Sequence, residues 1–215
     1  MISSSPDKKT VYIVDLGIQN ILSVENAFGT IGADVRVIST VAEVEDAQFL
    51  VLPGVGAYSA AAKKLHDTGL DAAIRRHAVD RKMPLLGLCL GMQLLADHSE
   101  EFGFNKGLGL IPGKVVKLVD QPPQFRVPNI GWRDVQHTGC SHLLKRAQSP
   151  SAYYHVHSFH FECKDRQDVA GFSNFGNQDI TSIVHRANIF GAQFHPEKSQ
   201  ESGLNLLHLV LHNLK

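Results

Sequence analysis

The sequence has little of several features that mark common classes of protein. It contains only three cysteines among 215 residues, Cys89, Cys140 and Cys163, without zinc-type spacing. This argues against a disulfide framework and leaves room for a free, reactive thiol. Lysine plus arginine and aspartate plus glutamate both number 21, so no charge excess indicates nucleic acid or an anionic membrane as a partner. No apolar run approaches the roughly 18 residues of a membrane-spanning helix.

No internal repeat, low-complexity tract or linker divides the chain. A length of 215 residues suits one well-buried domain. We therefore predict a single domain over 1–215, with no space for a second catalytic domain. The polar start MISSSPDKKT has no apolar signal core, so we expect residues 1–9 to be a flexible leader on a cytoplasmic protein.

Strand-like and helix-like segments alternate in the first half of the chain. Apolar runs at 11–15, 35–39, 49–54 and 85–88 predict strands, separated by helical patterns at 21–28, 57–65 and 70–80. Later segments at 115–119, 132–135, 153–159, 169–173, 180–185 and 189–194 predict strands joined by turns, before a helix at 202–214. Apolar strands separated by helices are typical of a parallel sheet covered on both faces. We predict an α/β fold with a flavodoxin-like, open and mostly parallel sheet, helices on both faces, and extra antiparallel strands in the C-terminal half.

Cys89 stands between Gly87 and Gly91, after a strand-like run and before a helix-like one. This is the pattern of a nucleophile elbow, a turn so tight that the two flanking positions must be glycine. The helix N-terminus favours a thiolate, and Leu90 has an N–H free to bind an oxyanion. The alternative is a buried structural cysteine that glycines happen to flank.

Two further segments fit such a nucleophile. His195 and Glu197 in FHPEKS are two residues apart, so in an extended segment both side chains face the same way, and the carboxylate can orient the imidazole. In PGVG (53–56), glycines let a main-chain N–H of Val55 or Gly56 turn toward a ligand as a second oxyanion donor. Alone, FHPEKS also fits a solvated acid beside one of the twelve histidines of the chain. Alone, PGVG also fits an ordinary turn.

PGVG (53–56), GLCLGMQLL (87–95) and FHPEKS (194–199) together resemble the class I, or triad, glutamine amidotransferase family. The resemblance runs from YIVDLGIQN (12–20) to the C-terminal helix. Within the family, the sequence is most similar to the glutaminase subunits of imidazole glycerol phosphate synthase.

The resemblance implies that Cys89 attacks the side-chain amide of glutamine, that His195 transfers the proton, and that Glu197 orients His195. It implies oxyanion contacts from Leu90 and the 54–56 loop, and no cofactor or metal. The expected substrate-binding residues are Gly54, Gln93, Glu101, His157, Ser158 and Phe159. Glu101 suits the substrate ammonium, although it also fits a surface acid in the run HSEE.

The resemblance also implies a heterodimer. Ammonia would pass to a (β/α)₈-barrel synthase subunit that makes imidazole glycerol phosphate in histidine biosynthesis. Asn129 and Trp132 in NIGW match the segment that faces this partner, although Trp132 fits a core anchor equally well.

Several alternatives stay open. Asn129 replaces a histidine common in the histidine-biosynthetic subunits, and 99–115 looks closer to paralogues that feed ammonia to a sugar amidotransferase in surface-polysaccharide biosynthesis. Anthranilate synthase, a stand-alone γ-glutamyl hydrolase and a glutamine-binding regulatory subunit are further alternatives. His155 and His157 share a strand face but have no suitable carboxylate cluster nearby for a metal site.

Overall fold

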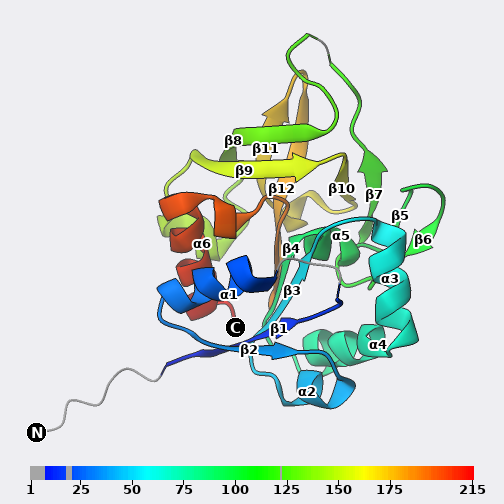
Figure 1. Ribbon diagram of the computed structural model, residues 1–215. Coiled ribbons are helices and arrows are strands. Elements are labelled where there is room, and N and C mark those ends of the chain that lie inside the picture. Colours follow the sequence, from blue (N-terminus) through cyan, green and yellow to red (C-terminus); the bar gives the residue numbers. More distant parts are fainter. Residues whose placement is uncertain (1–7, 18–20, 122) are drawn as a thin grey trace, which may run out of the picture.

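The computed structural model describes residues 8–17, 21–121 and 123–215, and a nine-stranded sheet forms its centre (Figure 1). Five parallel strands occupy one half of the sheet. In spatial order they are β2 (Asp34–Ile38), β1 (Thr10–Val14), β3 (Leu50–Gly54), β4 (Leu85–Cys89) and β13 (Ile189–Ala192). This is the flavodoxin-like strand order, as the sequence predicts.

The parallel strands are apolar throughout because both faces of the sheet are covered. In β3, Leu50 and Leu52 pack with the helices α3 (Tyr58–Asp67) and α4 (Leu70–Arg75). Val51 points the other way, into the core formed with α1 (Ile21–Thr30) and α6 (Gln200–Asn213). Figure 1 shows these two helix pairs on opposite sides of the sheet. Alternate residues therefore contribute to two separate cores.

The C-terminal half adds antiparallel strands, which confirms the expectation. Beyond β13 the large sheet continues with β12 (Gln178–Arg186), β11 (Val169–Phe175), β8 (Asn129–His137) and β9 (Ser151–His157). A second sheet contains β10 (Phe159–Cys163), β7 (Gly113–Lys117), β5 (His98–Ser99) and β6 (Asn105–Lys106). The short helices are α2 (Val41–Asp46), α5 (Leu90–Leu94), the π-helical η1 (Arg76–Asp80), and the 3₁₀ turns η2 (His142–Arg146), η3 (Arg166–Asp168) and η4 (Pro196–Lys198).

One local prediction was wrong, and one helix was missed. The segment 153–159 is not one strand: the chain bends at Ser158, and β9 and β10 belong to different sheets. The sequence also has an unanticipated helix, α2, although its N-terminus carries a capping box. The Thr40 N–H donates to Glu43 Oε2 at 3.0 Å, and the Glu43 N–H donates back to Thr40 Oγ1 at 3.4 Å.

Most of the expected leader lies outside the described residues, as do residues 18–20 of the N-terminal motif. Lys9, the last residue assigned to the leader, is attached to the fold. Its ammonium donates to the carbonyl oxygen of Leu211 at 2.9 Å, and its own carbonyl accepts from the Asp34 N–H at 2.9 Å. Within the described ranges, every helix is too short or too polar to cross a membrane.

Candidate active site

Cys89 occupies the sharp turn between β4 and α5, with φ +52° and ψ −110°. A non-glycine residue held there stores strain of about 1–3 kcal/mol. A Cβ on Gly87 would come within 2.7 Å of the Gly91 carbonyl oxygen, which confirms the predicted close approach. A Cβ on Gly91 would come within 1.7 Å of the Leu52 carbonyl oxygen on β3. Glycine is therefore required at position 91 because β3 lies so close, and not because of Gly87.

The PGVG loop lies beside this elbow. Gly54 pairs with Cys89 across β3 and β4, and a Cβ there would lie 2.8 Å from Leu90 Cβ. Val55, Gly56 and Leu90 line the cavity above Cys89, with Gly56 at φ +92°. Gly54, predicted to bind substrate, lies behind these residues and is absent from the cavity lining.

His195 and Glu197 meet in a buried pair. His195 Nδ1 lies 2.7 Å from Glu197 Oε1, and both side chains are only 5% exposed. The expected extended segment is wrong: β13 ends at Ala192, and the 3₁₀ turn η4 begins at Pro196 and brings the two side chains together. Ser199 holds the turn, since its hydroxyl donates to the His195 carbonyl at 2.6 Å.

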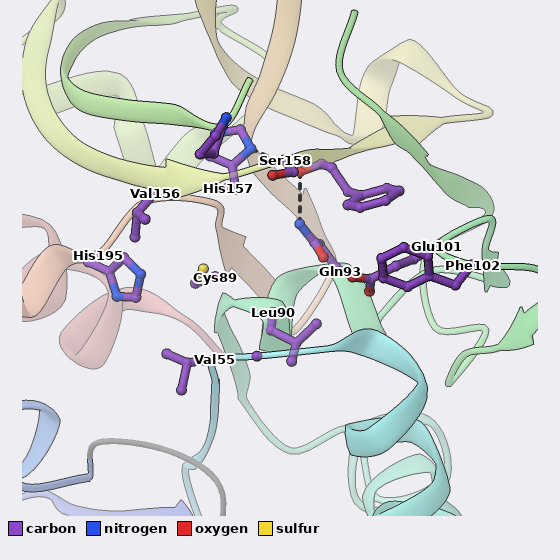
Figure 2. Close-up of a pocket in the computed structure, with 13 residues that line it drawn as sticks. Val55, Cys89, Leu90, Gln93, Glu101, Phe102, Val156, His157, Ser158 and His195 are labelled. Atoms are coloured by element: carbon purple, nitrogen blue, oxygen red, sulfur yellow. Dashed lines mark hydrogen bonds between the residues drawn. The ribbon is translucent and has the colours of Figure 1, made fainter. Parts of the chain in front are cut away.

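The electrostatics of His195 favour its charged form. Burial alone would lower the pKa of the imidazole, but the neighbouring Cys89 and Glu197 side chains outweigh burial and raise this pKa to about 10. Nε2, the ring nitrogen that does not face Glu197, is buried. Figure 2 shows the ring beside the Cys89 sulfur. The arrangement can therefore exchange a proton between sulfur and Nε2 while Glu197 holds Nδ1.

A cavity of about 380 Å³ joins these groups. Its lining consists of Val55, Gly56, Cys89, Leu90, Gln93, Glu101, Phe102, Pro128, Val156, His157, Ser158, Phe159 and His195. Glu101 Oε2 accepts from the Tyr58 N–H at 2.7 Å, which fixes a carboxylate at the cavity. Gln93 Nε2 donates to the Phe159 carbonyl at 2.9 Å (Figure 2). Of the predicted catalytic, oxyanion and substrate-binding residues, all except Gly54 and Glu197 line this cavity.

His157, Ser158 and Phe159 form the junction of β9 and β10. His157 Nδ1 donates to the Phe159 carbonyl at 2.9 Å, so Nε2 accepts from the Asn129 amide at 3.0 Å. Burial lowers the pKa of His157 to about 3, so the ring is neutral. The junction is held by hydrogen bonds that leave no charge on this histidine.

Comparison with known proteins identifies the family. A model of the class-I glutamine amidotransferases matches residues 12–213. The chain belongs to this family. Imidazole glycerol phosphate synthase subunit HisH 2 of Nitrobacter winogradskyi is 43% identical over 92% of this chain and 95% of that protein. HisH of Leptospira borgpetersenii is 36% identical, over 91% and 96% of the two chains.

Solved structures agree on the fold. A crystal structure of a glutamine amidotransferase matches with a TM-score of 0.70 at 18% identity, covering 94% of this chain and 97% of that one. PurLQS from Thermotoga maritima matches with the same TM-score and identity, covering 97% and 100%. The resemblance drawn from the three motifs is confirmed, and with it the enzyme class: the chain is a glutamine amidotransferase with glutaminase activity.

The two residues expected at a partner interface differ sharply in solvent exposure in this amidotransferase. Asn129 is fully buried between His157 and Arg133, so its side chain has no surface to offer a partner. Trp132 is 45% exposed, and the nearby Ile130 and Val156 are also exposed, at 53% and 36%. Sequence patterns could not separate buried from exposed positions on this strand.

Sequence reasoning missed Gln193, which follows β13. Its side chain is fully buried, and its Nε2 lies 3.9 Å from Cys89 Sγ. The available signal was one amide residue in the otherwise apolar run IFGAQF. In the described part of the chain, no group of three or more histidine, cysteine, aspartate or glutamate side chains could hold a metal ion.

Proposed function

We propose that this chain is the glutaminase subunit of an imidazole glycerol phosphate synthase. It hydrolyses L-glutamine and passes ammonia to a (β/α)₈-barrel synthase subunit, in histidine biosynthesis in the cytoplasm. Support comes from the relatives named above, which match over more than 90% of this chain, and from the cavity built around Cys89. The observation that carries the chemistry is the buried His195–Glu197 pair, with Nε2 presented beside the sulfur.

In the first half-reaction, the Cys89 sulfur attacks the side-chain carbonyl carbon of glutamine, and the thiol proton resides on His195 Nε2. The carbonyl oxygen becomes an oxyanion, which the N–H groups of Leu90 and of Val55 or Gly56 stabilise. Collapse breaks the carbon–nitrogen bond. His195 gives its proton to the leaving nitrogen, so ammonia departs and a γ-glutamyl thioester remains.

In the second half-reaction, water attacks the thioester carbonyl while His195 takes the water proton. The carbon–sulfur bond breaks, glutamate leaves, and Cys89 recovers its starting state. Glu197 stays ionised and keeps Nδ1 of His195 protonated throughout, which leaves Nε2 as the group that exchanges protons.

The cavity has groups for both ends of the substrate. The Glu101 carboxylate suits the glutamine ammonium, and it is already held by the Tyr58 N–H. The main chain of His157, Ser158 and Phe159 supplies hydrogen-bonding groups for the α-carboxylate end. Gln93 lies between these groups and Cys89.

The exposed apolar residues suit the synthase partner. Ile130 pairs with Val156 across β8 and β9, and Trp132 pairs with Tyr154 two residues along, so all four side chains share a face. Val156 also lines the cavity. A partner docked on this face would cover the cavity beside Cys89, where ammonia is released.

The test is steady-state release of glutamate from glutamine, by the chain alone and with a (β/α)₈ synthase subunit carrying its nucleotide ligand. Strong activation that Cys89→Ala abolishes would support the proposal. Turnover that needs Cys89 but ignores the synthase would keep the glutaminase and reject this partner. A sugar amidotransferase would then be the next acceptor to assay.

A further inference from the structure

Gln193 has a fully buried side-chain amide, and the half-reactions above assign it no role. Its backbone N–H donates to the Ser182 carbonyl at 2.9 Å, which anchors the residue next to β12. A buried carboxamide needs partners for both its oxygen and its amino group. The side-chain contacts of Gln193 are with Gln93 and Cys89.

The orientation of this amide follows from its neighbours. The Phe159 carbonyl can only accept, so the Gln93 amino group must face it, at 2.9 Å. The same amino group donates to Gln193 Oε1 at 3.0 Å. The opposite orientation of Gln193 would set two amino groups against each other. Its own amino group therefore faces Cys89 Sγ, at 3.9 Å.

This contact suits one particular state of the sulfur. An ionised sulfur accepts a hydrogen bond more strongly than a thiol or a thioester does. A donor fixed beside Sγ therefore stabilises the thiolate before attack and again as the thioester breaks. The amide is neutral, so it adds no charge that would compete with the protons moving through His195.

We propose that Gln193 is a further residue of the reaction centre, whose amide N–H holds the Cys89 sulfur in position and stabilises its thiolate. Gln93 sets the orientation of Gln193, which couples the glutamine-binding side of the cavity to the nucleophile. This inference rests on the thiolate chemistry of the proposed function.

The experiment compares Gln193→Leu, which lacks the donor, with Ser182→Ala as a matched control. Ser182 is equally buried on the neighbouring strand, and its hydroxyl bonds to Ser173 Oγ at 2.8 Å. The first readout is the pH dependence of Cys89 alkylation by iodoacetamide, followed by peptide mass spectrometry to separate Cys89 from Cys140 and Cys163. The second is kcat and KM for glutamine.

In Gln193→Leu, the alkylation profile should move to higher pH by roughly half a unit to one unit. Its kcat should fall roughly tenfold with little change in KM. Gln193→Glu, which sets a carboxylate against the sulfur, should move the profile further in the same direction. Ser182→Ala should match the wild type in both readouts, whatever its melting temperature.

A Gln193→Leu profile that superimposes on the wild type would overturn the inference. If Gln193→Leu does not fold, Gln193→Met, which keeps the unbranched length, is judged by the same criterion. Alkylation requires neither glutamine nor a synthase subunit. A wild-type chain that alkylates normally but releases no glutamate even with the liganded synthase subunit would therefore refute the proposed function without deciding this one.

Discussion

Two buried histidines that line the cavity have opposite properties. His195 lies beside Cys89 and against the Glu197 carboxylate, and these two groups raise its pKa to about 10 despite burial. His157 lies against the neutral Asn129 amide and the Phe159 carbonyl, and burial lowers its pKa to about 3. Burial is similar at the two sites, since the residues are 4% and 7% exposed. The presence or absence of an ionised neighbour, rather than the degree of burial, therefore decides whether each imidazole is charged.

This difference separates two segments of the cavity lining, the segment after β13 and the junction of β9 and β10. In the proposed mechanism, the segment after β13 exchanges protons, while the junction of β9 and β10 offers neutral hydrogen-bonding groups to the substrate. His155 and His160 extend the neutral group, since burial lowers the pKa of each to about 4. One charged histidine, His195, therefore faces Cys89, while His155, His157 and His160 stay neutral.

The largest effect should come from removing the charged histidine. His195→Asn removes the group that exchanges protons with Cys89, so kcat should fall by about four orders of magnitude or more. His160→Gln serves as the matched change in the neutral group and should keep kcat within about fivefold of wild type. Glutamate release at saturating glutamine measures both. Comparable losses of kcat in the two variants would contradict the distinction between the charged His195 and the neutral histidines.

Removing only the carboxylate should have the next largest effect. Glu197→Gln keeps the size of the side chain but not its charge, so one of the two groups that raise the pKa of His195 is lost and this pKa should fall. We expect kcat to fall by about two to three orders of magnitude, because the tautomer and charge of His195 are no longer enforced. The kcat–pH profile measures it, and a Glu197→Gln enzyme with wild-type kcat would show that the carboxylate is dispensable.

The two kinds of histidine should also change stability in opposite pH ranges. His155, His157 and His160 have lowered pKa values when folded, so the unfolded chain binds more protons between pH 6.5 and about 4. The free energy of unfolding should therefore fall as pH drops through this window, by on the order of 3 kcal/mol for His160 alone. His195 has a raised pKa, so its contribution is complete below pH 6.5 and is lost as pH rises through about 10.

Urea unfolding between pH 4 and pH 7 measures the acid side. His160→Gln should flatten the decline, because glutamine does not titrate in this window. Equal slopes in His160→Gln and the wild type would show that His160 is not the neutral buried group described above.

The smallest predicted effect converts one kind of histidine into the other. Asn129→Asp places a carboxylate about where the amide lies, 3.0 Å from His157 Nε2. Because Nδ1 already donates to the Phe159 carbonyl, bonding to a carboxylate requires both ring nitrogens to be protonated. The pKa of His157 should rise by about one unit or more. An NMR titration measures this, and Asn129→Ala is the control in which the ring stays neutral.

The sequence predicts the parallel half of the molecule and the triad residues because their signals are local. Apolar runs mark the strands, and Gly87 and Gly91 mark the elbow. The break at Ser158 leaves no such mark, since the residues on both sides suit strands and no glycine or proline lies between them. The burial of Asn129 and the contact of Gln193 with Cys89 depend on strands that are distant in sequence. Long-range packing, rather than any motif, creates these two features.

The charge of the His195 imidazole is the quantity on which the proposed chemistry depends most directly. NMR of the chain labelled with ¹⁵N-histidine, recorded at pH 8, reports the protonation of each ring. The His195 ring should be doubly protonated at this pH in the wild type and neutral in Glu197→Gln, while His157 stays neutral down to pH 5 in both. A wild-type His195 that titrates near pH 6.5, like an exposed histidine, would contradict the carboxylate-held triad.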